Sequence, residues 1–157
     1  MNKIRIIGCW ICYNNIQTIK HSIMSVYDFV DELVVVDGSF DGNHSDDGTW
    51  EIVESIKHTL PKPLTHIVSF ANTLYDKHNE HVNVTGNQDP NLFTWQVDSD
   101  EVYLPKHAAE IAKVIHTNQY NGIAVKLINV NRIENTEAFT DESCISNDTY
   151  QMRIYYL

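Results

Sequence analysis

Two aspartates, Asp98 and Asp100, stand two positions apart after an apolar run that closes on Trp95-Gln96-Val97. At the end of an extended strand, side chains two residues apart point to the same side, so both carboxylates can converge on one cation. Mg²⁺ and Mn²⁺ prefer oxygen ligands, and Mg²⁺ is typically held by one or two protein carboxylates together with phosphate oxygens. An isolated Asp-x-Asp is also a common solvated turn. The apolar strand predicted before this pair favours a metal site for a phosphate ligand.

Two other polar pairs also follow apolar runs, Tyr13-Asn14 after the first run and Asp37-Gly38 after the second. Each pair alone is weak evidence, because aspartate and glycine are common turn residues after a strand. In an open parallel sheet, however, ligands bind in the crevice outside the carboxyl ends of the strands. We therefore expect both pairs to line one binding site together with Asp98-Ser99-Asp100.

The elements that must position these clusters alternate between strand and helix. Apolar runs predict strands over residues 4–12, 33–36, 64–70, 92–97, 122–130 and 150–157. Apolar residues at spacings of three and four predict helices over 16–26, 50–56 and 106–116, while residues 71–84 are ambiguous and 131–148 are polar and irregular. The alternation predicts the α/β class, with a Rossmann-like, mostly parallel sheet and helices on both faces. Trp10, Trp50 and Trp95 are expected in the core.

Composition limits the class of ligand. The 157 residues, 43% of them hydrophobic, suffice for one buried core, so we expect a single domain over residues 1–157. The net charge of −10 argues against a nucleic-acid partner, because the phosphate backbone would be repelled. A phosphate ligand remains compatible where carboxylates hold a divalent cation. No apolar run is long enough to cross a bilayer, and a charge interrupts the first apolar stretch, so the expected location is the cytoplasm.

The three cysteines, an odd number, argue against a disulfide framework. Cys9 and Cys12 lie on the first predicted strand, where positions three apart face opposite sides of the sheet. We interpret them as buried structural thiols and not as a redox pair or half of a zinc site. His78 and His81 stand at helical spacing, but the sequence identifies no carboxylate to orient them, so a catalytic zinc is disfavoured.

The order and approximate spacing of these motifs resemble the family 2 glycosyltransferases of the GT-A fold. That family has a valine-rich strand ending in Asp, a loop closing on Ser-Thr-Asp-Gly-Thr, a Lys-Arg-Asn helix, and an apolar strand running into Asp-x-Asp-Glu. The corresponding segments here are Val34-Val35-Val36-Asp37, Ser45-Asp46-Asp47-Gly48-Thr49, Lys77-His78-Asn79 and Val97-Asp98-Ser99-Asp100-Glu101. The resemblance covers residues 4 to about 104, and the segment 151–155 looks like the strand that carries an arginine in many members.

The resemblance implies a transferase that moves a sugar from a nucleoside diphosphate sugar to a hydroxyl group. UDP-sugar is the first choice of donor, and the acceptor is an unidentified glycan, lipid or protein. Asp37 would contact the base or ribose, Asp98 the ribose or the metal-bound diphosphate, and Asp100 would be the principal ligand of Mn²⁺ or Mg²⁺. Lys77 would lie near the donor phosphates, and Asp47 would shape the loop over the nucleotide. The remaining residues expected at the donor site are Tyr13, Asn14, Gly38 and Ser99.

The chain also departs from this family. Asn14-Asn15 stands where many relatives carry an acidic residue, His78 replaces the usual arginine, and the loop over residues 38–45 is longer than in common members. Inverting members take their general base from the second half of the domain, where Asp141 and Glu142 form the only acidic pair. The chain barely reaches that half and stops on three apolar residues, so we expect it to be truncated on the acceptor side.

Two other functions stay open. A sugar nucleotidyltransferase would be built on a similar sheet, but it needs a glycine-rich, basic loop after the first strand to hold a triphosphate. The segment Cys12-Tyr13-Asn14-Asn15 offers neither feature. A non-catalytic nucleotide-binding module would need no acceptor half and no general base.

Overall fold

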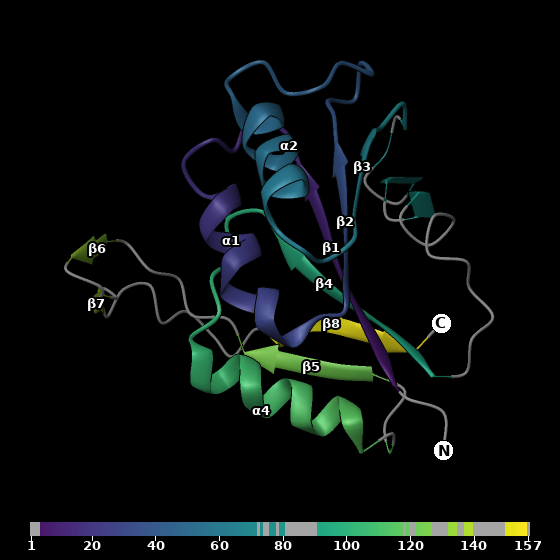
Figure 1. Ribbon diagram of the computed structural model, residues 1–157, viewed down its shortest axis with the longest axis vertical. Coiled ribbons are helices and arrows are strands. Elements are labelled where there is room, and N and C mark those ends of the chain that lie inside the picture. Colours follow the sequence, from purple (N-terminus) through teal and green to yellow (C-terminus); the bar gives the residue numbers. More distant parts are fainter. Residues whose placement is uncertain are drawn as a thin grey trace.

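The computed structural model describes residues 4–71, 73, 76, 77, 79, 80, 91–117 and 119, and the backbone of the strands at 122–126, 132–134, 137–139 and 150–156. Six strands form one sheet in the order β3-β2-β1-β4-β8-β5 (Figure 1). Their bounds are β1 Arg5–Cys12, β2 Glu32–Asp37, β3 Leu64–Val68, β4 Leu92–Asp98, β5 Gly122–Lys126 and β8 Tyr150–Tyr156.

The sheet is parallel on one side and antiparallel on the other. Strands β3, β2, β1 and β4 are parallel, whereas β8 runs antiparallel to both β4 and β5. Strands β2 and β3 lie on one side of β1, and β4 lies on its other side. The strand order therefore reverses beside β1. Cys12 pairs with Asp37 and Ile11 pairs with Asp98, so the three strands end at one edge. The predicted mostly parallel α/β sheet is confirmed.

Strand β1 is buried on both faces, and its side chains alternate between two apolar clusters, as the two-residue period of a strand requires. Trp10 and Cys12 belong to a cluster that includes side chains from all three long helices. Ile7 and Cys9 belong to a smaller cluster built from strand residues alone. Cys9 and Cys12 are therefore buried on opposite faces, and burial raises the pKa of both thiols. Their predicted burial on opposite faces of the sheet is confirmed.

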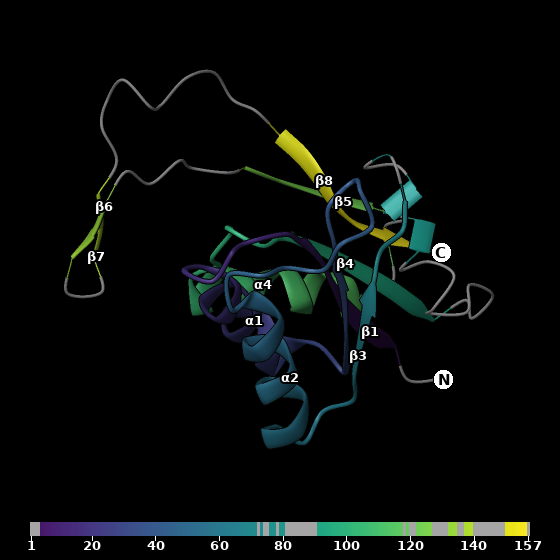
Figure 2. The same cartoon turned by 90° about the horizontal axis from the view of Figure 1, so that it is seen from above.

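Three helices pack on one face of the sheet because each buries an apolar stripe against it. They are α1 Ile19–Val26, followed by the 3₁₀ turn η1 Tyr27–Phe29, α2 Thr49–Thr59 and α4 Pro105–His116. In both views α1 and α2 lie on one side of the strands, and the helical residues described at 76, 77, 79 and 80 lie on the other (Figures 1 and 2). The long helices thus share one face, and the second face carries only this short helical segment among the described residues.

The structure corrects four details of the sequence prediction. The sequence predicts no regular structure over residues 131–148, but β6 Arg132–Glu134 and β7 Glu137–Phe139 pair antiparallel in a separate sheet. Strands of three residues are too short to show an alternating pattern. β3 ends at Val68 and not at residue 70, and α1 begins at Ile19 because a turn closed by the Asn15 carbonyl precedes it. Trp50 is half-buried and lies against His44 and His66, outside the apolar core.

Candidate functional site

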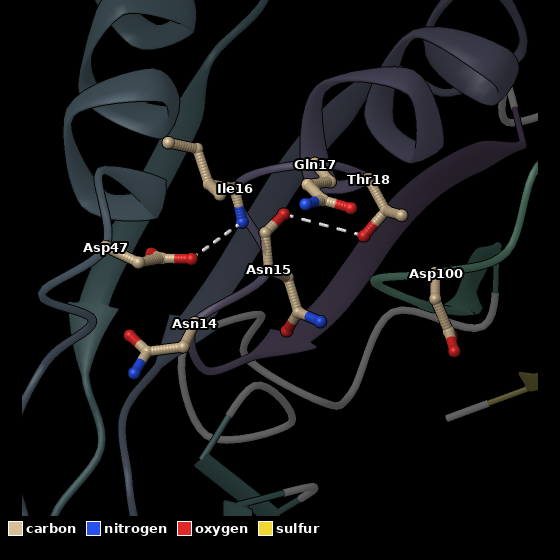
Figure 3. Close-up of a pocket in the computed structure, with 7 residues that line it drawn as sticks. All are labelled: Asn14, Asn15, Ile16, Gln17, Thr18, Asp47 and Asp100. Atoms are coloured by element: carbon tan, nitrogen blue, oxygen red, sulfur yellow. Dashed lines mark hydrogen bonds between the residues drawn. The ribbon is translucent and has the colours of Figure 1, made fainter.

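A cavity of about 270 Å³ lies at the reversal point of the strand order. In doubly wound sheets this is where ligands bind, because the loops after the two neighbouring strands diverge there. Figure 3 shows Asp47 and Asp100 on opposite sides of the cavity, with Asn14 and Asn15 between them. The complete lining is Asn14, Asn15, Ile16, Gln17, Thr18, Asp47 and Asp100.

The turn after β4 brings Asp100 to this cavity. Asp98, the last residue of β4, donates its N–H to Glu101 Oε2 at 3.2 Å, and its carbonyl accepts from Glu101 N at 2.9 Å and Ser22 Oγ at 3.0 Å. Ser22 lies on α1, so the turn is fixed to a helix as well as to the sheet. The Asp100 side chain is exposed, and no described residue offers its carboxylate a hydrogen bond or an ion pair. Its charge is available to a cation.

The loop after β1 forms the opposite wall, and its backbone donors are bound within the protein. Asn14 adopts a left-handed conformation with φ 53°, donates its N–H to Ser45 Oγ at 2.8 Å, and accepts from Asp46 N at 3.0 Å. The N–H of Tyr13 donates to Asn15 Oδ1 at 3.0 Å, and the N–H of Asn15 donates to Thr49 Oγ1 at 2.8 Å. The wall is therefore rigid, but the amides from Tyr13 to Ile16 are not available to a ligand.

Asp47 joins this wall to α2. Its Oδ2 accepts from Ile16 N at 3.0 Å, and its Oδ1 accepts from Thr49 N at 2.9 Å and Thr49 Oγ1 at 2.6 Å. Burial acts to raise the pKa of the Asp47 carboxyl, but the hydrogen bonds from Thr49 and Ile16 outweigh burial and hold it below its ordinary value of 3.8. Asp47 therefore holds the loop after β1 to the start of α2, and a position of this loop over a nucleotide stays a prediction.

Asp37 lies behind the site, fully buried at the end of β2. Its Oδ1 accepts from Ser45 N at 3.1 Å and Ser45 Oγ at 2.6 Å, and its Oδ2 faces His66 Nε2 at 3.8 Å. The other ring nitrogen of His66 lies 2.8 Å from Glu54 Oε1, and Trp50 stacks on the imidazole with 3.8 Å between ring centroids. In this structure Asp37 acts on the loop through Ser45, and its contact with a ligand stays a prediction.

Sequence reasoning missed Ser45 as a partner of Asp37 and missed His66 altogether. The available signal for His66 was a single imidazole inside an apolar strand, between Thr65 and Ile67. Buried polar groups need partners, so a histidine in β3 indicates a polar neighbour on an adjacent strand. The sequence does not say which one.

A second cavity, of about 380 Å³, opens beside the ends of β1 and β2. Its lining is Ile11, Cys12, Tyr13, Asn15, Gly38, Ser39, Phe40, Asp41 and Lys77. Lys77 is buried, donates its Nζ to the Gly38 carbonyl, and lies 4.8 Å from the centroid of the Phe40 ring. Burial lowers the pKa of Lys77, while Glu80 and Asp37 act in the opposite direction. The predicted residues Tyr13, Gly38 and Lys77 thus meet in one cavity, and a contact between Lys77 and phosphate stays a prediction.

Several predicted groups are not brought together here. Asp141 and Glu142 lie outside the described residues. The described residues contain no cluster of three or more histidine, cysteine, aspartate or glutamate side chains suited to a metal. A cation held by Asp98 and Asp100 would therefore need further oxygens from its ligand. None of the described helices is long and apolar enough to span a membrane.

No protein-family model matches the sequence, and no curated protein matches it. The fold is similar to the crystal structure of S. aureus TarS 1-349, with TM-score 0.58 and 22% identity over 83% of this chain and 38% of that one. The same TarS fragment in complex with UDP gives TM-score 0.59 and 23% identity over 82% and 37% of the two chains. The crystal structure of a 4-diphosphocytidyl-2C-methyl-D-erythritol synthase is also similar, with TM-score 0.60 and 14% identity over 98% of this chain and 76% of that one.

TarS is a family 2 glycosyltransferase of the GT-A fold. At these identities the similarity shows the fold, and the predicted GT-A-like architecture is confirmed. The chain spans less than two fifths of the TarS fragment.

Proposed function

We propose that the chain binds a nucleoside diphosphate sugar, with UDP-sugar the first choice, and transfers the sugar to a hydroxyl group of a glycan, lipid or protein acceptor. One observation carries the proposal: the unpaired Asp100 carboxylate lies in a cavity at the point where the strand order reverses. The similarity of the fold to TarS, which has been crystallised with UDP, supports a pyrimidine nucleotide as the ligand.

The residues at the cavity fit a divalent cation. Asp100 is exposed and unpaired among the described residues, and Asp98 precedes it by two positions at the end of β4. Two carboxylates suit Mg²⁺ or Mn²⁺ when a ligand diphosphate supplies the other oxygens. When bound, the ion supplies positive charge that stabilises the departing nucleoside diphosphate.

The protein's own residues position the donor on either side of this point. The cavity with Tyr13 and Gly38 takes the nucleoside, with Lys77 in its wall near the donor phosphates, and the cavity with Asp100 takes the metal-bound diphosphate and the sugar. Ser99 is largely buried within the turn and stands between Asp98 and Asp100 in the chain. Asp141 or Glu142 is our candidate for the base that removes the proton from the acceptor hydroxyl.

Calorimetric titration with UDP, with and without Mn²⁺, tests the site. Asp100→Ala should weaken Mn²⁺-dependent binding of UDP by at least about tenfold, because a charge-assisted contact contributes ~1.4 kcal/mol or more. Glu110→Ala removes another exposed carboxylate, on α4, and should leave UDP binding unchanged. Absence of metal-dependent binding in the parent chain, or equal binding by the Asp100 variant, would overturn the proposal. Donor turnover then separates an enzyme from a non-catalytic module, since a module binds UDP-sugar and leaves it intact.

The similarity to the diphosphocytidyl-methylerythritol synthase favours nucleotidyl transfer as a second candidate. That reaction needs free backbone donors after the first strand to hold a triphosphate. Here the N–H groups of Tyr13, Asn14, Asn15 and Ile16 all donate within the protein. We therefore expect no pyrophosphate release from CTP or UTP with a sugar phosphate and Mg²⁺. Steady release under these conditions would favour the second candidate over the first.

A further inference from the structure

The loop between β2 and α2 carries an exposed aromatic ring, Phe40, which is 56% exposed. A single exposed apolar side chain is ordinary on a protein surface. Phe40 differs because it lies in a cavity wall and because the turn that carries it is tightly hydrogen bonded.

Ser39 organises that turn. Its Oγ accepts from the N–H groups of Asp41 and Asn43, both at 3.2 Å, and its own N–H donates to the Asn43 carbonyl at 2.8 Å. Gly42 takes φ 77°, a conformation that favours glycine, and donates to the Ser39 carbonyl at 3.3 Å. Four bonds within five residues fix the backbone that carries Phe40.

Lys77 supports the ring and the start of the loop together. Its ammonium group donates to the Gly38 carbonyl and lies 4.8 Å from the centroid of the Phe40 ring. A cation at this distance is attracted to the face of an aromatic ring. The ring is therefore held in place although more than half of it is exposed to solvent.

The same cavity has a second exposed aromatic ring, Tyr13, which is 41% exposed. Tyr13 follows β1 and Phe40 follows β2, and the Gly38 N–H donates to the Cys12 carbonyl at 3.0 Å, which ties the two loops at their origins. The volume of about 380 Å³ lies within the usual range of ~300–1,000 Å³ for small-molecule sites. Two exposed rings in one small cavity suit a flat aromatic ligand.

We propose that Phe40 stacks on the nucleobase of the bound nucleotide and, with Tyr13, sets the preference of this cavity for a nucleoside. This inference rests on the proposed donor site and extends it to a loop residue that the family pattern does not include. Stacking uses only the flat face of the base, so Phe40 supplies affinity, and hydrogen bonds from the cavity supply base identity.

Three ligands test the role of Phe40: UDP, uridine, which keeps the base and ribose of UDP, and inorganic pyrophosphate, which keeps only its diphosphate. Phe40→Ala should weaken UDP, measured with Mn²⁺, and uridine by about 5-fold to about 140-fold, which corresponds to ~1–3 kcal/mol for one stacked base. Inorganic pyrophosphate with Mn²⁺ should bind unchanged, because it has no base. Phe40→Tyr keeps an aromatic face and should bind UDP within about twofold of the parent chain.

Phe70→Ala is the matched control. Phe70 is 74% exposed and lies against the same turn, since a Cβ on Gly42 would come within 3.1 Å of its ring, but it does not line the cavity. Its loss should leave UDP affinity unchanged. If Phe70→Ala weakens UDP as much as Phe40→Ala, or if Phe40→Ala weakens pyrophosphate equally, Phe40 acts through the loop and the inference is overturned.

The two proposals fail differently. Unchanged UDP binding by Phe40→Ala, together with loss of binding by Asp100→Ala, would remove the stacking role and leave the donor site standing. Failure of the parent chain to bind UDP at all would remove both. Circular dichroism of each variant confirms that it is folded, which is expected because Phe40 is outside the apolar core.

Discussion

Replacing Asp47 by alanine should destabilise the fold by about 2–3 kcal/mol. The substitution removes three hydrogen bonds, one from Ile16 and two from Thr49, and with them the link between the loop after β1 and the start of α2. The N-cap residue of α2 is Gly48, but the bond from the Thr49 N–H to Asp47 resembles a capping bond, and loss of a capping bond costs ~0.5–2 kcal/mol. Three hydrogen bonds to a charged group, at ~1.5–3 kcal/mol each, would cost more than twice the value expected here. The lower figure holds because Asp47 is half-exposed, so water replaces part of what is lost.

Thermal and urea unfolding of the two proteins measure this loss. For a chain of this length, 2–3 kcal/mol corresponds to a fall in Tm of about 4–12 °C. The urea midpoint should fall while the slope m stays constant, because the surface exposed on unfolding does not change.

Asp46→Ala is the control for this measurement. Asp46 is the exposed neighbour, and its recorded hydrogen bond to Asn14 uses its backbone N–H and not its side chain. Its loss should therefore stay within about 0.5 kcal/mol of the parent chain. Equal stability of the Asp47 variant and the parent chain, or equal losses at positions 46 and 47, would refute the reasoning that Asp47 holds the cavity wall to α2.

Three further outcomes follow from named contacts. The pKa of Asp47 is lower in the folded protein than its ordinary 3.8. The stabilisation of the fold by ionised Asp47 is therefore complete above pH 3.8 and is lost as the pH falls through the lower, folded-state pKa. Unfolding curves of the parent chain and Asp47→Ala should differ at about pH 7 and converge in acid. Gly48→Ala should cost about 1–2 kcal/mol in urea unfolding, because Gly48 takes φ 103° and its new Cβ would lie 2.8 Å from the end of the Ile16 side chain. With the third cysteine replaced by serine, Cys9 and Cys12 should react with a thiol reagent only after unfolding, since both are buried and their pKa values are raised; rapid labelling of the native protein would contradict this.

The parallel half of the sheet could be predicted because its strands are continuous apolar runs that end in polar pairs. Burial on both faces makes β1, β2 and β4 mostly apolar, and this pattern is local enough to recognise. The position of the candidate site followed from the same runs, since parallel strands end at one edge. Asp100 and Asn14, which line one cavity, could therefore be placed near each other before any contact was known.

The connections behind the site could not be predicted in the same way. The chain of Glu54, His66 and Asp37 joins a helix to two strands, and no sequence spacing indicates that these three side chains meet. Phe40 was missed because one aromatic residue in a polar loop has no period, and its role depends on a turn and on Lys77 from a distant segment. The placement of all three long helices on one face also depends on how the chain crosses the sheet, which hydrophobic periodicity does not specify.

The antiparallel neighbour of β4 has a consequence for the order of folding. Phe93 in β4 pairs with Tyr156 in β8, so residues 99–149 must be synthesised before β4 gains its second neighbour. A nascent chain that ends within this interval carries the parallel strands with β4 as a bare edge, and unpaired edges recruit strands from other chains. Closing so long a loop is also slow. The longer the synthesis of β8 takes, the longer β4 therefore stays open to pairing with strands of other chains.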